Sequence, residues 1–179
     1  MIKKNSKVFV TGHKGLVGSS ILKTLKKKGF KNIITADRKQ LNLLDKNKVN
    51  YFIKSKKVEY IINCAAKVGG ILANSIKPVE FFYENIQMQN NLLLSAHKYK
   101  IKRFVFLGSS CIYPRNSLTP IRENQLLSGK LEKTNEAYAI AKISGVKLSE
   151  FLFNQYKMDI ICVMPTNLYG VNDNFDKYT

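Results

Sequence analysis

The sequence predicts an α/β fold with a doubly wound parallel sheet, and three observations support that prediction. Apolar runs rich in β-branched and aromatic residues alternate with longer segments of helical period. The runs VFV, YIIN, FVFL and IICVM are almost continuously apolar, as in parallel strands that are buried on both faces. A turn with three glycines joins the first such run to the first helical segment. The sheet is therefore expected to be open and to bind a ligand where its strands end.

Strands and helices are expected to alternate along the whole chain. The predicted strands are Lys7 to Thr11, Asn32 to Ala36, a short Leu41 to Leu44, Val58 to Cys64, Arg103 to Leu107 and Ile160 to Met164. The predicted helices are Leu16 to Lys28, Lys46 to Ser55, Pro78 to Tyr99 and Asn135 to Tyr156. An irregular segment from Ser109 to Thr134 is long for a compact domain, which favours a functional role. With no repeat or linker visible, residues 1–179 are expected to form one domain.

The composition is that of a folded domain, because 45% of the 179 residues are apolar and 11% are aromatic. The three cysteines are odd in number, widely spaced and outside any CxxC pair, so neither a disulfide framework nor a metal site is expected. No stretch approaches the roughly 20 apolar residues of a membrane span, and the amino-terminal lysines precede no apolar signal region. We expect a soluble, cytoplasmic protein without a membrane partner.

The net charge of +18 raises the alternative of nucleic-acid binding. Lysine supplies nearly all of the positive charge, and the only arginines are Arg38, Arg103, Arg115 and Arg122. Base and phosphate recognition usually relies on arginine forks, which are scarce here. Several lysines also stand where helices should end, where a cation suits the helix dipole. The lysines are therefore interpreted as a solvated surface with no nucleic-acid partner, and attraction of a polyanionic ligand is the alternative.

The segment VFVTGHKGLVGSSILKTL places three glycines between the first strand and the first helix. In this context the first glycine permits a tight turn, the second lets the backbone approach a pyrophosphate, and the third lets the helix pack on the strand. The phosphates would then meet the positive end of the helix. This GxxGxxG variant predicts that residues 1–179 are a Rossmann-type NAD(P)-binding domain. The residues expected at the cofactor are Gly12, His13, Lys14, Gly15, Leu16, Val17 and Gly18, with His13 either touching a phosphate or merely lining the loop.

The second strand ends in Thr35-Ala36-Asp37-Arg38, where the ribose of the adenosine half should lie. An acidic residue at this place favours a free 2′-hydroxyl, and an arginine favours a 2′-phosphate. Both are present. Because Arg38 can fork onto a phosphate or stack on adenine, and Lys14 adds charge nearby, NADPH is the favoured cofactor. The alternative interpretation is that Arg38 is an ordinary surface residue.

Tyr138 and Lys142 form a YxxxK pair on one face of a predicted helix. A neighbouring ammonium stabilises a phenolate, so we expect a lowered pKa that makes the tyrosine a useful acid or base. Ser109 follows the strand FVFL, where ligands of open α/β sheets bind, and its hydroxyl could share a carbonyl hydrogen bond with the phenol. The lysine could also hold the nicotinamide ribose. The alternative is a surface tyrosine and lysine with an unrelated turn serine.

The stretches GHKGLVGS, LNLLD, AAKVGGI, FLGSSCIYP, TNEAYAIAKISGVKL and VMPTNLYG together resemble the extended short-chain dehydrogenase/reductase family. They run through nearly the whole chain, and GSSCIYP and PTNLYG are far more specific than the glycine turn. The resemblance is strongest to the family's GDP-sugar epimerase/reductases. It implies an NADPH-dependent, usually homodimeric enzyme that carries out 3,5-epimerisation and 4-reduction of GDP-4-keto-6-deoxy-D-mannose to GDP-L-fucose.

The resemblance also implies roles for individual residues. Ser109, Tyr138 and Lys142 match the reductase triad, and Cys111 matches the acid/base of epimerisation. The implied cofactor contacts beyond the glycine turn are Arg38, Leu107, Gly108, Ser109, Ser110, Lys142, Pro165, Thr166, Asn167 and Leu168. Of these, Pro165 to Leu168 correspond to the loop on the nicotinamide side.

Cys111 has a separate chemical argument, because a thiol two residues past Ser109 should lie beside the same reacting sugar. A thiol that titrates near 8.5 can exchange protons next to a ketone. Simple packing is the alternative for Cys111 and the expected role of Cys64 and Cys162, which fall in strands. His97 is expected to be structural.

The resembled family continues past the PTNLYG loop with a histidine that partners the cysteine and a portion that holds the GDP-sugar, whereas this sequence stops at Thr179. We therefore expect a fragment with most of the cofactor site and half of the chemistry, lacking the substrate-binding carboxyl-terminal part. Two alternatives remain open. One is a related epimerase or reductase of another GDP-hexose or GDP-heptose, and the other is a non-catalytic dinucleotide-binding module.

Overall fold

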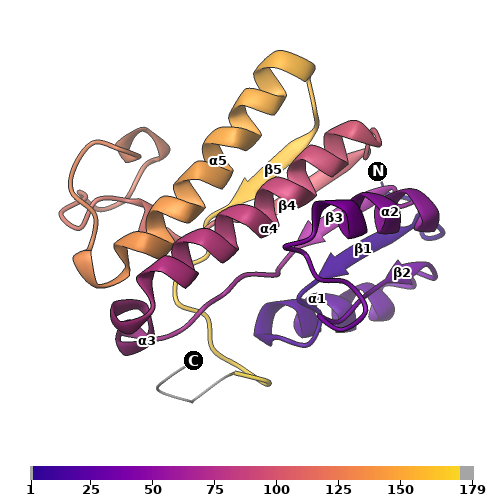
Figure 1. Cartoon of the computed structure of the whole chain (residues 1–179), viewed down its shortest axis with the longest axis horizontal. Coiled ribbons are helices and arrows are strands. Elements are labelled where there is room, and N and C mark those ends of the chain that lie inside the picture. Colours follow the sequence, from indigo (N-terminus) through magenta and orange to yellow (C-terminus); the bar gives the residue numbers. More distant parts are fainter. Residues whose placement is uncertain (1, 174–179) are drawn as a thin grey trace.

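A computed structural model describes residues 2–173 and places a five-stranded parallel sheet at the centre of the molecule (Figure 1). The predicted doubly wound α/β fold is therefore confirmed. The strands are β1 (Val8–Thr11), β2 (Ile33–Ile34), β3 (Tyr60–Asn63), β4 (Arg103–Leu107) and β5 (Ile160–Val163). Their order across the sheet is β2-β1-β3-β4-β5. The predicted domain also included residue 1 and residues 174–179, which lie outside the described residues.

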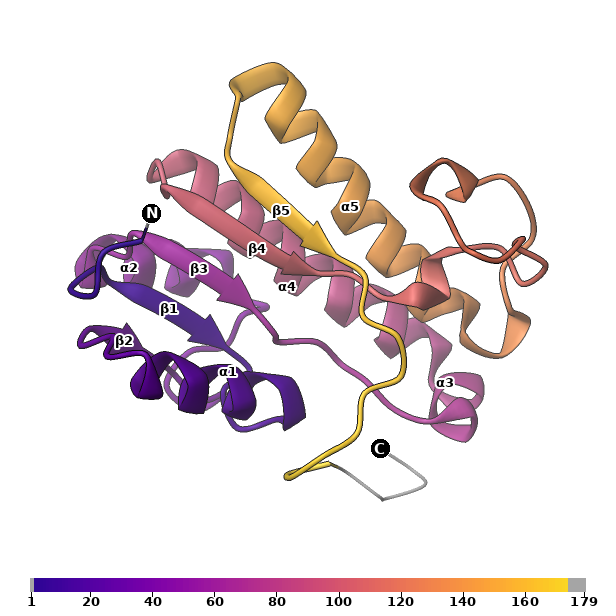
Figure 2. The same ribbon diagram turned by 180° about the vertical axis from the view of Figure 1, so that it is seen from behind.

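Helices cover the two faces of the sheet unequally. They are α1 (Leu16–Lys27), α2 (Lys46–Lys56), α3 (Ile71–Ile76), α4 (Pro78–Lys98) and α5 (Glu136–Tyr156). In Figure 1, α2, α4 and α5 lie in front of the sheet, and in the reversed view of Figure 2, α1 lies in front of it. Helix α4 packs against both α2 and α5. The main core consequently lies between the sheet and this three-helix layer.

The core is filled from the strands and from the inner faces of the long helices. Phe104 and Phe106 alternate with partly exposed residues along β4, and both are fully buried. Leu92 and Leu93 of α4 are also 0% exposed and belong to the same cluster. Burying each such side chain contributes about 1.5 to 3 kcal/mol relative to leaving it in water. This packing fixes the positions of the strand ends from which the site is built.

The strand order reverses direction between β1 and β3. From β1 the chain crosses to β2 on one side, and every later crossover leads to the other side. At this switch point the Thr11 hydroxyl donates to Asn63 Oδ1 over 2.7 Å, and the Ala65 N–H donates to the Thr11 hydroxyl over 3.0 Å. A topological switch point opens a crevice beyond the carboxyl ends of the two strands. The fold thus predicts the ligand site between the β1 and β3 loops.

Local capping signals explain the helix boundaries. Asp45 caps α2, because its carboxylate accepts hydrogen bonds from the N–H groups of Asn47 and Lys48. Helix α1 ends in lysines and is followed by Gly29 at a φ of +79°, the left-handed region that glycine adopts without strain. Within residues 2–173, no helix has the length and apolar character required to cross a membrane.

Several sequence predictions about individual elements were wrong. Leu41 to Leu44 form turns and not a strand, because Asn42 and Asp37 draw the backbone N–H groups there into local side-chain and turn bonds. The second strand is reduced to Ile33–Ile34. Helix α3 was not predicted, since its six residues follow a glycine pair and are too short for a helical period. The irregular segment holds two 3₁₀ turns, η1 (Ser110–Ile112) and η2 (Glu123–Gln125), and ends at a third, η3 (Lys133–Asn135).

Candidate active site

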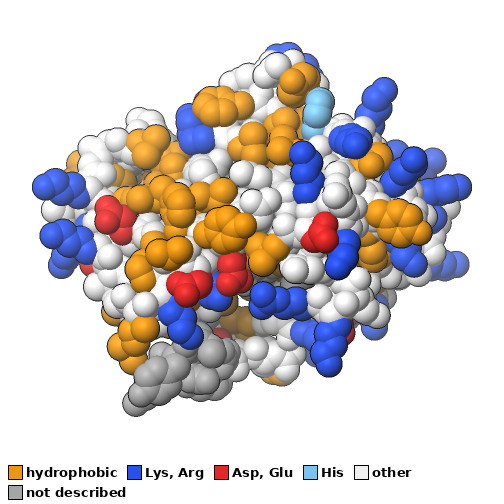
Figure 3. Space-filling view, viewed as in Figure 1, with side chains coloured by type: hydrophobic (Ala, Val, Ile, Leu, Met, Phe, Trp, Pro, Cys, Tyr) orange, Lys and Arg blue, Asp and Glu red, His pale blue; other side chains and the backbone are white. Residues whose placement is uncertain are grey.

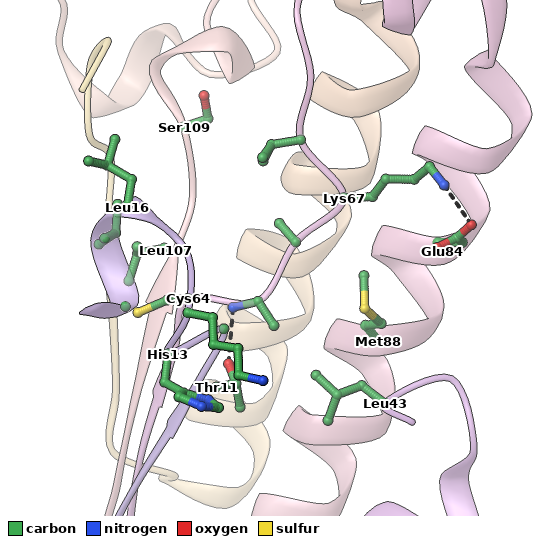
Figure 4. A pocket seen from close by; sticks show the side chains of 18 of the residues that line it. Thr11, His13, Leu16, Leu43, Cys64, Lys67, Glu84, Met88, Leu107 and Ser109 are labelled. Atoms are coloured by element: carbon green, nitrogen blue, oxygen red, sulfur yellow. Dashed lines mark hydrogen bonds and ion pairs between the residues drawn. The ribbon is translucent and has the colours of Figure 1, made fainter. Parts of the chain in front are cut away.

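A cleft of about 940 Å³ opens along the carboxyl edge of the sheet. Its walls come from the turn after β1, the end of β2, the loop after β3, the end of β4, and the loop after β5. Figure 4 shows side chains from several of these segments facing one another across the opening. The cleft therefore runs past the switch point and reaches from the β2 end to the β4 and β5 ends.

The glycine turn owes its shape to two positions where no side chain fits. Gly12 has a φ of +62°, and a Cβ there would stand 2.8 Å from the Ala65 nitrogen. A Cβ on Gly18 would overlap the carbonyl oxygen of Gly12. Gly15 differs, because its Cβ would meet only the Gly12 oxygen at 3.5 Å, an ordinary contact distance. Gly12 and Gly18 are thus required by the fold, and Gly15 leaves the mouth of the turn open.

This turn has the physical features of a pyrophosphate cradle. Gly15 stands at the amino end of α1 and offers no side-chain cap to the first-turn N–H groups. Uncapped N–H groups and the positive end of the helix dipole favour an anion at that place. Glycine at position 15 also leaves room for the anion to reach the backbone. The residues present therefore fit a dinucleotide.

At the β2 end of the cleft, charged side chains are exposed and paired. Lys14 Nζ lies 3.0 Å from the Asp37 carboxylate, which also accepts from the N–H groups of Lys39 and Gln40. The hydrogen bond from Lys14, followed by the one from the Gln40 backbone, lowers the Asp37 pKa. Arg38 lies on the same rim with its side chain 77% exposed, and its guanidinium is 3.8 Å from Glu84. Two cations thus stand at the expected position of the adenosine ribose.

At the β4 end, a short turn presents Ser109 and Cys111 together. Ser109 is the first residue past the Gly108 that follows β4, and its Oγ accepts the Cys111 N–H over 3.2 Å. The Gly108 N–H donates to the Val163 carbonyl over 2.8 Å, and the Ser110 N–H donates to the Pro165 carbonyl over 3.0 Å. These bonds tie the turn after β4 to the loop after β5.

Tyr138 and Lys142 face this turn from α5, but their ionisation differs from the sequence prediction. The pKa of Tyr138 is raised to about 12, chiefly by burial and secondly by the Cys111 thiol, and a hydrogen bond with Ser109 offsets part of the rise. The expected lowering by Lys142 does not occur. The ammonium lies 5.6 Å from the centre of the Tyr138 ring and donates to the Leu107 carbonyl over 2.7 Å. Burial also lowers the Lys142 pKa to about 8.

The phenol of Tyr138 is therefore in its neutral, proton-donating form at physiological pH. Lys142 is buried, with 4% of its surface exposed. Its ammonium donates to the Leu107 carbonyl and lies 5.1 Å from the centre of the Phe106 ring. The arrangement supports proton donation by the tyrosine and fixed positive charge from the lysine. It does not create a phenolate.

The cysteines occupy three different environments. The Cys111 sulfur accepts a hydrogen bond from Asn135 Nδ2 over 3.2 Å. Cys64 lines the cleft just after β3, where burial raises the pKa of its thiol to about 12. Cys162 lies on β5, and burial raises its pKa as well. Of the three, Cys111 is the one that meets the Ser109 and Tyr138 groups.

Most of the predicted site residues come together at this cleft. Tyr138 lines it, as do the predicted residues Gly12, His13, Lys14, Gly15, Leu16, Val17, Gly18, Arg38, Leu107, Gly108, Ser109, Lys142, Pro165, Thr166, Asn167 and Leu168. Ser110 and Cys111 lie on η1 and are not part of the lining. His97 lies elsewhere, on α4, with its ring centre 4.1 Å from that of Tyr156. Across residues 2–173, no group of three or more His, Cys, Asp or Glu could hold a metal ion.

Sequence reasoning missed the wall that follows β3. Residues Ala65 to Gly70 line the cleft, and so do Glu84 and Met88 of the neighbouring α4. Lys67 is fixed there, since its Nζ forms an ion pair with Glu84 over 2.8 Å and its backbone N–H donates to Asn85. Figure 4 marks the ion pair with a dashed line. The position of AAKVGG directly after a central strand was the available signal, because the ends of parallel strands gather at one edge. The loop at Leu41 to Leu44, predicted as a strand, also lines the cleft.

Comparisons with known proteins agree with this architecture. The profile of the NAD dependent epimerase/dehydratase family matches residues 8–178. The GDP-L-fucose synthase of Escherichia coli strain K12 is 47% identical over 94% of this chain and 53% of its own length. The GDP-L-colitose synthase of Yersinia pseudotuberculosis is 43% identical over 96% of this chain and 56% of its own.

A solved structure provides the three-dimensional counterpart. A GDP-mannoheptose C4 reductase from Campylobacter jejuni with NADP bound superimposes with a TM-score of 0.93 at 34% identity. The match covers 97% of this chain and 55% of that one. The chain thus spans about half the length of the curated relatives it matches. From its parallel sheet, its glycine turn and a family match over residues 8–178, the chain belongs to the NAD dependent epimerase/dehydratase family.

Proposed function

We propose that this chain is the cofactor-binding part of an NADPH-dependent enzyme of the GDP-L-fucose synthase type. The reaction would be 3,5-epimerisation and 4-reduction of GDP-4-keto-6-deoxy-D-mannose. The observation that carries the proposal is that Ser109 and Tyr138 line the β4 end of a cleft whose other end is the glycine turn, with Cys111 bonded to Ser109 from the adjoining η1 turn. The names of two relatives, a GDP-L-fucose synthase and a GDP-L-colitose synthase, support a GDP-linked deoxy sugar as substrate.

The favoured cofactor is NADPH. The glycine turn would hold the pyrophosphate, and Lys14 and Arg38 would face the 2′-phosphate at the other end of the adenosine. The NADP in the related heptose reductase structure supports the same choice. When bound, NADPH supplies the hydride that adds to the carbonyl carbon. The loop Pro165 to Leu168, tied to the β4 turn by the Ser110 N–H, would line the nicotinamide side.

The roles of the protein groups in reduction follow from their ionisation. Tyr138 is a neutral phenol and would donate its proton to the ketone oxygen as that oxygen gains negative charge. Ser109 would share the hydrogen bond to the same oxygen through its O–H, because its own oxygen already accepts from the Cys111 N–H. Lys142 would stabilise the resulting phenolate and position the ribose. Carbonyl carbon gains a hydride and carbonyl oxygen gains a proton, so the product is the alcohol.

Epimerisation needs a group that exchanges protons with the carbons beside the ketone. The Cys111 thiol would carry out this step, and the support is its position two residues from Ser109 and its electrostatic interaction with Tyr138. A pure ketone reductase would require the Ser109, Tyr138 and Lys142 set alone. The thiol at position 111 is the feature that favours epimerisation as well as reduction.

The reductase assignment is tested by Tyr138→Phe in the whole protein that carries this chain. NADPH oxidation with GDP-4-keto-6-deoxy-D-mannose should fall by about 100-fold or more, because the general acid is removed. NADPH binding, followed by the fluorescence of the reduced nicotinamide, should persist. Tyr156→Phe, on the same helix and far from the cleft, is the matched control and should retain full activity. Near-normal reduction by the Tyr138 variant would remove this residue from the mechanism.

A second candidate is reduction or epimerisation of another GDP-hexose or a GDP-heptose, and the heptose reductase with a TM-score of 0.93 favours considering it. NADPH oxidation with a GDP-4-keto-hexose can be compared directly with NADPH oxidation with a GDP-4-keto-heptose. Cys111→Ala separates the two reaction types, since it should abolish solvent deuterium incorporation beside the ketone and leave hydride transfer intact. Unchanged incorporation would mean that the thiol only packs.

We propose further that the protein is a cytoplasmic homodimer that pairs through α4 and α5. Hydrophobic side chains gather over these two helices in Figure 3. Exposed hydrophobic residues of α4 include Phe82 at 41% and Tyr83 at 57%, and those of α5 include Phe151 at 56%. Exposed apolar surface of this kind marks association sites. Sedimentation of Phe151→Glu should show a shift toward monomer, and an unchanged mass would contradict this surface.

A further inference from the structure

Asn135 is the N-cap residue of α5, yet it does not cap the helix. Asparagine is favoured at N-caps because its side-chain oxygen accepts a backbone N–H of the first turn. Here the Asn135 side chain makes no such bond. Its Nδ2 instead donates to the Cys111 sulfur over 3.2 Å, linking two residues that are 24 positions apart in the sequence. The Asn135 side chain therefore bonds to the thiol and does not cap the helix.

A second observation shows that this orientation works against the stability of the fold. Asn135 Oδ1 is buried and has no hydrogen-bond partner among the described residues. Buried polar atoms without partners are rare, because they lose their contacts with water and gain nothing in return. The orientation of the amide thus leaves its oxygen without a partner within residues 2–173 while its nitrogen contacts the sulfur. The observed geometry makes sense if the Nδ2–sulfur contact has a function.

Among the charged and titratable neighbours of the Cys111 sulfur, Tyr138 interacts with it electrostatically, and the others are held by different partners. The Tyr138 phenol, one turn along α5, is coupled to Cys111. The Glu132 carboxylate forms an ion pair with Arg115 over 3.3 Å and accepts a hydrogen bond from the Thr134 N–H. The Lys142 ammonium donates a hydrogen bond to the Leu107 carbonyl. On the η1 side, the Cys111 N–H is held by Ser109.

We propose that Asn135 is a positioning residue. It holds the Cys111 sulfur beside the Ser109 turn and stabilises the Cys111 thiolate by donating an N–H to the sulfur. This inference rests on the proposed function, in which Cys111 exchanges protons beside the ketone. An N–H donates more strongly to an anion than to a neutral sulfur, so the contact favours the thiolate. The thiolate takes a proton from the carbon beside the ketone, the electrons of that C–H bond pass into the enolate, and the proton leaves as S–H.

The test is the pH profile of Cys111 alkylation by iodoacetamide, measured peptide by peptide from pH 6 to 9.5. Only the thiolate reacts, so the rate at a given pH reports the thiolate population. Asn135→Ala should react about tenfold more slowly than wild type at pH 7, because a charge-assisted hydrogen bond is lost. The two rates should converge at high pH, where the thiol is fully ionised. Thr134→Ala, in the same 3₁₀ turn but without contact to the sulfur, is the matched control and should follow the wild-type profile.

The same measurement contains a check on folding. Cys64 and Cys162 are both partly buried and have raised pKa values, so their labelling should stay slow in any folded variant. If Asn135→Ala exposes them, Asn135→Asp replaces it, because the shape is kept while the donor is lost and a negative charge is added. Its Cys111 profile should shift to higher pH by more than that of the alanine variant.

Two results would overturn the proposal. One is a Cys111 profile that is unchanged in both Asn135 variants while Cys162 stays protected, and the other is faster alkylation, which would mean that the amide oxygen held the thiol proton. The experiment needs neither NADPH nor a GDP-sugar, so it can be read even if the proposed reaction is wrong. If it succeeds, Asn135→Ala in the whole protein should slow deuterium incorporation and leave NADPH affinity unchanged.

Discussion

The two ends of the cleft differ in how far their charged groups are exposed to water. At the glycine turn and the β2 end, the shape is set by backbone contacts, and the charged groups remain in water, with the Lys14 side chain 72% exposed. At the β4 end, the ionisable groups are partly or fully buried, with Lys142 only 4% exposed. Burial raises the Tyr138 pKa and lowers the Lys142 pKa at the second end, whereas at the first end hydrogen bonds from Lys14 and Gln40 lower the Asp37 pKa.

This contrast indicates a division between recognition and chemistry. An exposed ion pair contributes little to stability and is screened by salt, but it can attract a charged ligand. A buried ionisable group is costly to charge, so its protonation is controlled by the fold. Mutations at the two ends should therefore fail in different ways, and the following predictions run from the largest expected effect to the smallest.

The largest effect is expected at Gly18. Gly18→Ala places a Cβ against the Gly12 carbonyl oxygen, which cannot move without distorting the turn. We expect a loss of about 3 kcal/mol or more in the free energy of unfolding, measured by urea denaturation. Gly15→Ala, three residues earlier, should keep near-parental stability but bind NADPH more weakly. If the two variants were equally stable, backbone contact would not define this end of the cleft.

The next effect concerns the buried ammonium of Lys142. Its pKa of about 8 in the folded state lies below the usual 10.5, so the unfolded chain holds the extra proton between these pH values. The free energy of unfolding should therefore rise with pH across that window. Below pH 8 the buried ammonium is charged in the folded state, and its full destabilising effect is present. Relative to Lys142→Met, the wild-type protein should gain about 2 to 3 kcal/mol between pH 7 and pH 10 in parallel urea titrations. Parallel stability curves for the two proteins would contradict the burial of this charge.

A smaller effect is expected at Arg38, which acts on the ligand and not on the fold. Arg38→Ala should weaken NADPH binding by about tenfold, the size expected for one charged hydrogen-bonding partner, and leave NADH binding unchanged. Its melting temperature should equal that of the parent, because the side chain is 77% exposed. Equal losses for both cofactors would place Arg38 away from the 2′-phosphate.

The smallest effect is expected at Lys14. Lys14→Met breaks the exposed pair with Asp37, whose carboxylate keeps its backbone partners. We expect a change in melting temperature of at most about 2 °C, which disappears in high salt. A large, salt-insensitive loss would show that the β2 end depends on its charges as the β4 end does.

The sequence predicted the parallel sheet and the glycine turn of the cleft, because strand runs and the glycine turn are local signals, whereas the wall that follows β3 was missed. Gly12 and Gly18 could be identified from spacing alone, and the contacts at both positions explain why. The ionisation of Tyr138 could not be predicted, since the YxxxK spacing brings the two side chains near each other but says nothing of the Leu107 carbonyl that takes the ammonium. The contact between Asn135 and Cys111 was likewise hidden, because the two residues lie 24 positions apart in the sequence.

The pairing of β1 with β3 has a consequence for the order in which the protein assembles. The hydrogen bond between Thr11 and Asn63 joins residues 52 positions apart, and the bonds between the β4 and β5 ends span a similar distance. Closing such long loops costs entropy before the contacts form, so these pairings come late in folding. The cleft draws its walls from Phe9 through Asp173. During synthesis the ribosome must therefore release the stretch from Phe9 to Asp173 before the cleft can exist, and a nucleotide can bind only after that stretch has emerged.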